Sequence, residues 1–290
     1  MQRRVSLQCS GASNTIRAQN RVSALPRVRG PIAAGRFGPW RYLYIMTAQC
    51  CPIVELRHYT LRPGKRETLI ELFDREFIET QEEAGIQLIA QFRDIDRPDV
   101  FTWLRGFADM ESRAAALAAF YDGPAWHAHR DTANSTMIDS DNVLLLRPAR
   151  PGSGFVVDAA DRPVIGTTVI PRGLFVATIY PLAAAAAKSF AEIFYRVMMP
   201  ELITAGAVPI AVFETEPAKN TFPRLPVREG EHVFVWFARF ADVGAYDQHV
   251  AALEESRTWR EEVRPILDRS LASSVERWRL TPTARSRLFG

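Results

Sequence analysis

The sequence has few cysteines, few lysines and no long apolar run. Its three cysteines, Cys9, Cys50 and Cys51, all precede the first expected strand, so a disulfide framework is excluded and a reducing compartment is indicated. The longest candidate for a membrane span, around 181–190, is Ala-rich and contains Lys188, and it falls short of the roughly 20 apolar residues that a spanning helix needs. We therefore expect a cytoplasmic protein, of bacterial type, without a membrane span.

Acidic residues are absent from residues 1–45, which contain eight arginines and no lysine. Two interpretations stay open: a mitochondrial transit peptide, or a chain that starts at Met46 behind a disordered or mis-annotated extension. Without this segment the chain has 28 basic and 33 acidic residues. The sequence therefore predicts no basic face for nucleic acid.

The known signatures of catalytic and cofactor sites are also missing. No Gly-rich phosphate loop, nucleophile elbow or Ser-His-Asp pattern is present. Asp139 and Asp141 lack the spacing and the third carboxylate of a calcium loop, and they suit a turn before a strand. We expect neither a metal site nor a cofactor.

The sequence does contain an internal repeat. VFTWLRGFAD at 100–109 is matched by VFVWFARFAD at 233–242, and AGIQLIAQF at 84–92 by AGAVPIAVF at 205–213. The separation is constant within each pair of segments but grows by 12 residues between Phe213 and Val233, where a Pro- and Gly-rich stretch predicts an inserted loop. The chain therefore reads as two copies of one domain.

Each copy predicts the order β-α-β-β-α-β, with first strands at 53–61 and 174–182. Gly85 and Gly206 are expected to end the first helices, and Asp109 and Asp242 to cap the second ones. This is the ferredoxin-like order, whose sheet is covered by helices on one face only. We expect an α+β protein in which two tandem ferredoxin-like repeats close into a dimeric α+β barrel, an intramolecular pseudo-dimer; a further homodimer stays open.

The expected domain boundaries follow from these patterns. They are an N-terminal extension at 1–49, a first barrel repeat at 50–150, a linker at 151–171, a diverged second repeat at 172–283 and a C-terminal tail at 284–290.

The segments VELRHYTLRPGK (54–65) and FYDGPAWHAHRDTANSTMIDSDNVLLLRP (120–148) resemble the NIPSNAP family of dimeric α+β barrel proteins. The second copy resembles the family weakly. The resemblance implies a ferredoxin-like barrel whose biochemical role is unsettled, because wider relatives include cofactor-free monooxygenases, haem-handling enzymes, small-molecule binders and partner-binding proteins.

The first strand carries the leading site candidates. Glu55, Arg57 and Tyr59 alternate and share one face. We expect Val54 and Leu56 to lie beneath helices, which would place the polar trio in or near the barrel lumen. Arg57 could hold an anionic or enolate oxygen while Tyr59 donates a hydrogen bond; alternatively Glu55 and Arg57 form a structural ion pair.

Further candidates lie on other elements. His129 could act as a general base near neutral pH; the alternative is a helix-surface or strand-capping histidine. Trp103 and Trp236 occupy matching places in the two copies and could line an apolar cavity or fill the core, and Tyr180 matches Tyr59. If Arg105 faces the same way as Trp103, it adds a second cation beside Arg57.

The function predicted from these residues is binding of an apolar or aromatic small molecule in the barrel. Chemistry like that of a cofactor-independent monooxygenase or isomerase would use Arg57, Tyr59 and His129 as catalytic residues, with Glu55, Trp103, Arg105, Tyr180 and Trp236 in the pocket. The alternatives are a non-catalytic interaction module and, third, a haem-binding barrel with His129 or His58 as ligand.

Overall fold

The computed structural model describes residues 51–157 and 162–288, and the possible targeting segment, Cys9 and Cys50 lie outside them. The first half follows the expected order, with β4 as a short addition. Its elements are β1 (Ile53–Leu61), α1 (Arg66–Leu72), α2 (Ile78–Glu83), β2 (Gln87–Asp94), β3 (Val100–Phe107), α3 (Met110–Tyr121), α4 (Pro124–Thr136), β4 (Met137–Asp139) and β5 (Val143–Pro148).

The second half repeats this order of elements. They are β6 (Leu174–Leu182), α5 (Ala184–Ile193), α6 (Met199–Thr204), β7 (Pro209–Thr215), β8 (His232–Phe240), α7 (Val243–Glu255), α8 (Arg264–Ser270) and β9 (Glu276–Pro282). A π-helical turn joins α1 to α2 and α5 to α6, so each of these pairs continues as one helix. A third π-helical turn leads into α8, whereas α7 ends at Ser256, whose backbone is extended.

The local signals for helix ends are confirmed. Asp109 accepts a hydrogen bond from Ser112 N at 2.6 Å, and Asp242 accepts one from Ala245 N at 2.9 Å. Gly85 and Gly206 follow the first helices with φ of 91° and 95°, in the left-handed region that a side chain would disfavour.

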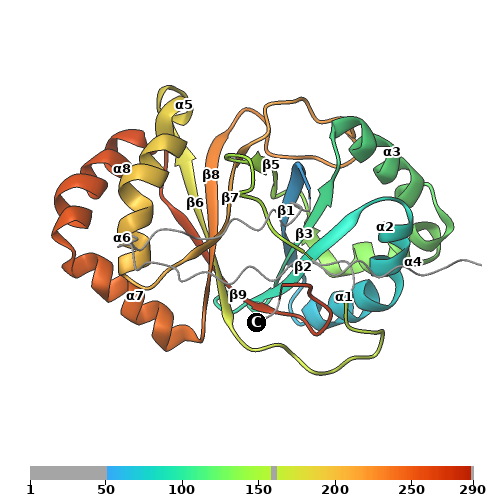
Figure 1. Ribbon diagram of the computed structural model, residues 1–290. Helices are drawn as coiled ribbons and strands as arrows, with labels where there is room; N and C mark the ends of the chain where they lie inside the picture. The colour runs from blue at the N-terminus through green and yellow to red at the C-terminus, as the bar shows by residue number, and fades with distance from the viewer. Residues whose placement is uncertain (1–50, 158–161, 289–290) are drawn as a thin grey trace, which may run out of the picture. The chain divides into compact units, whose positions relative to one another are not determined.

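Eight strands form a closed antiparallel barrel shared by both halves. The order β3-β2-β9-β6-β8-β7-β5-β1 closes by pairing β1 with β3, while β4 extends one end of β1. Strand β5 pairs with β7 and β2 pairs with β9, so these two seams join the halves. Figure 1 shows the strands in the middle, with α1–α4 on one side and α5–α8 on the other.

Apolar side chains from all eight barrel strands fill the lumen. Val54 and Leu56 belong to this cluster, together with large side chains such as Phe92, Phe213 and Trp278. The sequence prediction for β1 was therefore inverted: Val54 and Leu56 face the lumen, and Glu55, Arg57 and Tyr59 face the helices. The lumen receives apolar side chains from both halves, and the less polar face of β1, with Val54, Leu56 and His58, packs into it.

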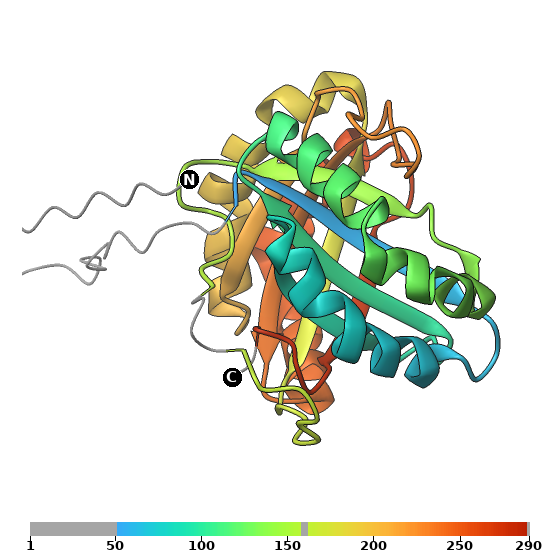
Figure 2. The same cartoon turned by 90° about the vertical axis from the view of Figure 1, so that its right-hand side faces the viewer.

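Two further cores lie between the sheet and the helices, one in each half. Figure 2 shows α1–α4 lying across the outer face of the first-half strands. None of the helices in the described part of the chain has the length and apolarity for a membrane crossing.

The segment after β9 packs on the first half. Thr283 N donates to Gln91 O at 2.8 Å, and Arg285 binds Glu79 and the carbonyl of Asp74. Arg162, from the segment between the halves, donates to Glu82 at 2.6 Å. Contacts of both segments thus add to the two strand seams.

Candidate functional site

A cluster of charged side chains is buried between the sheet and the helices of the first half. The Glu55 carboxylate receives hydrogen bonds from three guanidinium groups: Arg57 Nη1 at 2.5 Å, Arg105 Nε at 2.7 Å and Arg113 Nε at 2.7 Å. All four side chains are 0–1% exposed. The predicted Glu55–Arg57 ion pair is confirmed, and Arg105 joins it because it lies opposite Glu55 in the β1–β3 register.

The arginines determine the ionisation of Glu55. Burial alone would raise the pKa of this carboxyl, but the positive charges of Arg105, Arg57 and Arg113 outweigh it and hold the pKa well below its ordinary value. Glu55 is therefore an anion over the whole physiological pH range, and its proton affinity is too low for a general base.

Tyr59 links the cluster to an aromatic layer. Arg57 Nε donates to the Tyr59 hydroxyl oxygen at 2.7 Å, and Trp103 packs edge-on against Tyr59. The guanidiniums of Arg57 and Arg105 lie 5.4 and 5.1 Å from the Trp103 ring centroid, within cation–π distance. Burial raises the pKa of Tyr59 to about 12, so the hydroxyl keeps its proton and can donate it in a hydrogen bond.

A cavity of about 90 Å³ adjoins this aromatic layer. Buried Tyr59, Gln81 and Trp103 form its floor, whereas exposed Asn134 and half-buried Leu225 lie toward its mouth. The rest of the lining is mainly aromatic, from Phe73, Phe77, Phe120, Tyr121 and Trp126. Such a site is apolar with a few polar groups on one wall, which is typical of small-molecule pockets.

Among the described residues that line the cavity, Leu225 alone comes from the second half. It belongs to the predicted insertion between β7 and β8, at 216–231, which reaches the first half. Phe222 stacks on Tyr121, with ring centroids 5.9 Å apart. Asn220 Oδ1 and Thr221 Oγ1 accept hydrogen bonds from Arg113 Nη1 at 3.0 and 3.1 Å.

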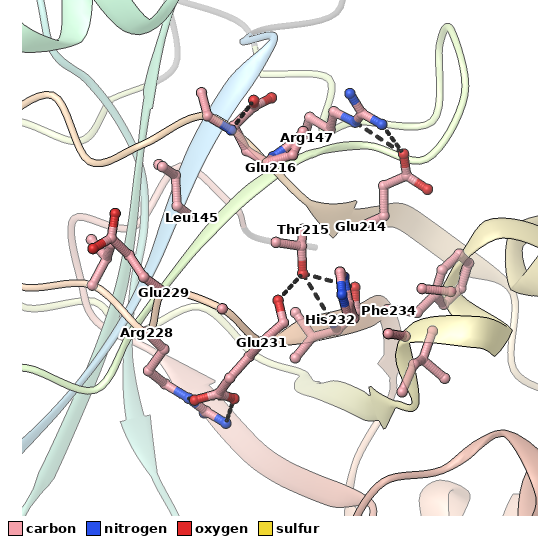
Figure 3. A pocket seen from close by; sticks show the side chains of 18 of the residues that line it. Leu145, Arg147, Glu214, Thr215, Glu216, Arg228, Glu229, Glu231, His232 and Phe234 are labelled. Carbon is pink, nitrogen blue, oxygen red and sulfur yellow. Dashed lines mark hydrogen bonds and ion pairs between the residues drawn. The ribbon is translucent and has the colours of Figure 1, made fainter.

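The base of this insertion is held by several polar contacts, shown in Figure 3. Thr215 Oγ1 donates to Glu231 O at 3.1 Å and accepts from Val233 N at 2.7 Å, which closes the loop where it leaves the sheet. Arg228 pairs with Glu231 at 2.6 Å. A groove of about 1020 Å³ lies along this base, lined by charges of both signs. These contacts fix the loop that carries Leu225.

The matching positions of the second half are apolar or uncharged. Glu55, Arg57 and Arg105 correspond to Val176, Thr178 and Ala238, which occupy the same register between β6 and β8. Gln81 and Arg113 correspond to Leu202 and Tyr246. The fold is thus built in the second half without a charged cluster.

The two tyrosine–tryptophan pairs also differ. Trp236 Nε1 donates to the Tyr180 hydroxyl at 3.4 Å, in the core of the second half. Trp103 Nε1 is buried without a hydrogen-bond partner among the described residues. The structure therefore brings Glu55, Arg57, Tyr59, Trp103 and Arg105 together and leaves Tyr180 and Trp236 in the other half.

The candidate histidines lie apart from the cluster. His129, on α4, is 31% exposed and lies 3.4 Å from Glu76, outside the cavity lining. His58 faces the lumen, where it stacks on Trp278 at 3.9 Å and its Nδ1 lies 2.8 Å from Thr102 Oγ1. Burial lowers the pKa of His58 to about 3. His58 is therefore a neutral core histidine whose Nδ1 is hydrogen-bonded.

Sequence reasoning missed Arg113 and the residues of the insertion. Arg113 occupies the inward stripe of its helix with Ala116, Leu117 and Phe120, at helical spacing. A charge at such a position indicates a buried polar partner, so this signal was present in the sequence. For the insertion the signal was weaker. Its apolar residues Phe222 and Leu225 indicate burial, but they do not indicate which part of the protein they pack against.

Comparisons with known proteins agree with this geometry at the level of the fold. The NIPSNAP family model matches residues 54–151, and no curated protein matches the chain. A solved anthrone oxidase-like protein aligns over 82% of this chain and 95% of its own, with 12% identity and a TM-score of 0.50.

Solved NIPSNAP proteins align with a smaller part of the chain. A NIPSNAP family protein from Agrobacterium tumefaciens is 26% identical over 33% of this chain and 84% of its own, with a TM-score of 0.31. A NIPSNAP-like domain protein from Burkholderia xenovorans is 25% identical over 39% of this chain and 90% of its own, with a TM-score of 0.30. The family model stops at residue 151, so a NIPSNAP-like second half stays a prediction. The expected dimeric α+β barrel fold is confirmed, and residues 54–151 of this chain match the NIPSNAP family.

Proposed function

We propose that this protein binds a small organic molecule in the cavity between the helices and the sheet of its first half, and that Tyr59 donates a hydrogen bond to an oxygen of that molecule. The carrying observation is the buried hydrogen-bond chain Glu55–Arg57–Tyr59, which ends at the cavity wall. In this hydrogen-bond chain the Tyr59 oxygen accepts from Arg57, so the Tyr59 hydroxyl proton is the group that can be donated to a ligand.

The contrast between the halves supports a binding role over a purely structural one. Buried ion pairs add little to stability compared with well-packed apolar side chains. The second half reaches the same architecture with Val176, Thr178 and Ala238. A fold that does not need the charged cluster can retain it for recognition.

The same geometry supports stabilisation of negative charge on a bound oxygen. Hydrogen-bond donors fixed in a dry site stabilise an oxyanion more strongly than donors in water. However, the described lining contains neither a carboxylate nor a histidine. We therefore propose binding with oxyanion stabilisation. A reaction of the monooxygenase or isomerase type would require a substrate acidic enough to lose its proton to water before it binds.

The small volume defines the first probe. A cavity of about 150 Å³ holds benzene, with its six carbon atoms, so one of 90 Å³ suits about four non-hydrogen atoms. Acetamide has this size and carries no charge. The full-length protein is labelled with ¹⁵N at tryptophan, and the Trp103 indole N–H resonance is assigned as the one that Trp103→Phe removes. We expect acetamide to shift this resonance saturably.

Trp236 provides the internal control, because its N–H already has Tyr180 as partner. Tyr59→Phe should weaken binding at Trp103, and the matched Tyr180→Phe should leave it unchanged. Absence of a saturable shift at Trp103, or an equal shift at Trp236, would contradict the proposal.

A further inference from the structure

The buried cluster carries an excess of positive charge. Arg57, Arg105 and Arg113 surround the single carboxylate of Glu55, so two positive charges remain uncompensated by the part of the chain that the structure describes. The other groups that contact the arginines are neutral: the amide oxygens of Gln81 and Asn220, and the hydroxyls of Tyr59 and Thr221.

Such an excess is unfavourable in a dry site. Transfer of an unpaired ion into a protein interior costs several kcal/mol even after relaxation, and nearby cations add mutual repulsion. The other half of the chain, where the matching strand positions are Val176, Thr178 and Ala238, avoids this cost entirely. A compensating anion would remove much of it in the first half.

Three buried N–H groups, two in the arginine cluster and one on the adjoining Trp103, have no partner among the described residues. They are Trp103 Nε1, Arg105 Nη2 and Arg113 Nη2. Buried donors are nearly always satisfied in native structures, so three together point to a missing acceptor. Trp103 and Tyr59 both line the cavity, and the guanidiniums of Arg57 and Arg105 lie directly behind them.

We propose that the ligand of this cavity is a small carboxylate, an inference that rests on the binding function proposed above. Its oxygens accept hydrogen bonds from the Tyr59 hydroxyl and from Trp103 Nε1. The arginines stabilise its charge from behind this layer, and the aromatic wall with Leu225 accommodates its apolar end. One bound monoanion reduces the excess charge from two to one.

The test compares acetate with acetamide, which has the same size and shape without the charge. Both are titrated into the full-length ¹⁵N-tryptophan-labelled protein at constant ionic strength and constant chloride, and the Trp103 indole N–H resonance is followed. We expect acetate to bind at least tenfold more tightly than acetamide, with a downfield shift of the N–H proton as it donates to a carboxylate.

Two conservative variants and their matched controls localise the effect. Trp103→Phe and Tyr59→Phe should each weaken acetate binding several-fold, measured for Trp103→Phe by the thermal shift that acetate produces. Trp236→Phe and Tyr180→Phe remove the same groups from the second half and should leave acetate binding unchanged.

The outcomes separate the two proposals. Equal affinities for acetate and acetamide would overturn the carboxylate preference and leave the small-molecule site standing. Tighter binding of acetamide would do the same. Failure of both probes to produce a saturable shift at Trp103 would overturn the site itself.

Discussion

Replacing the whole charged cluster should affect stability less than removing its single carboxylate. Glu55→Leu leaves three buried guanidiniums facing one another, because Arg57, Arg105 and Arg113 all bind this carboxylate at 2.5–2.7 Å and none is exposed above 1%. The quadruple variant Glu55→Leu, Arg57→Met, Arg105→Met, Arg113→Met removes every charge together and approximately preserves the side-chain volumes.

The two magnitudes follow from the burial of the cluster. Removing one partner of a buried ion pair typically costs about 3–5 kcal/mol, because the remaining charge is uncompensated. For Glu55→Leu this corresponds to a folded-to-unfolded ratio lower by roughly 10²–10⁴. Replacement of the whole set by apolar side chains ranges from neutral to about 4 kcal/mol more stable. In the quadruple variant the oxygens of Gln81 and Tyr59 lose their arginine donors, whereas the Asn220 oxygen keeps Phe222 N as a donor, so we expect a result near neutral.

Urea unfolding at pH 7, followed by far-UV circular dichroism, measures both effects as changes in the free energy of unfolding. The sum of the single-variant costs should greatly exceed the cost of the quadruple variant, since the four residues form one network. The same quadruple variant should no longer bind acetate.

Two results would refute this reasoning. If the quadruple variant is destabilised as much as Glu55→Leu alone, the cluster is required for the fold, and its absence from the second half has another explanation. If Glu55→Leu costs less than about 1 kcal/mol, the carboxylate contributes no more than an exposed ion pair would.

Three further predictions concern other parts of the molecule. The folded pKa of His58, about 3, is below the ordinary 6.5, so between these values only the unfolded chain binds a proton at this residue and the native state loses stability as pH falls. At pH 4.5 the loss is about 3 kcal/mol, and His58→Phe should remove that part of the pH dependence of urea unfolding. Phe222→Ala should release the insertion from Tyr121, seen as faster amide hydrogen exchange around Leu225 with β6 unchanged; unchanged exchange around Leu225 would show that Phe222 does not hold the loop. Asp242→Ala should cost about 1 kcal/mol through loss of the α7 cap, whereas Asp242→Asn, which retains a capping oxygen, should cost much less.

Alternation along β1 was sufficient to predict that Glu55, Arg57 and Tyr59 share a face, but not which face. In an open sheet the polar face is exposed to water, so the choice is simple. In a closed barrel with helices outside, both faces of a strand are shielded from water, so Val54 and Leu56 could pack either in the lumen or against the helices. The decision depends on the lumen, whose filling includes Trp278 from the other end of the chain, and this information is absent from the strand itself.

Of the charged cluster, the position of Arg105 could be predicted from strand pairing, but the contact between Arg113 and the insertion could not. Arg105 could be placed beside Glu55 once β1 and β3 were paired, since the alternation of β3 aligns it with Trp103. The contact of Arg113 with Asn220 joins residues 107 positions apart through a loop that has no regular structure. Its destination is determined by the barrel closure and not by local propensity.

The position of the insertion explains why the site is one-sided. Strand β7 pairs with β5 of the first half, so a loop that leaves β7 starts at the seam, and its two ends bond to the first half: Glu216 N to Leu145 O and Arg228 N to Val143 O, both at 2.9 Å. The equivalent loop of the first half, 95–99, leaves β2 at the opposite seam, where Ile95 N donates to Arg279 O at 2.9 Å. Only five residues long, it is too short to reach over the helices of the second half. The longer loop, 216–231, therefore completes a candidate site in the first half. The second half has no such loop over its helices, so apolar side chains can fill its matching positions.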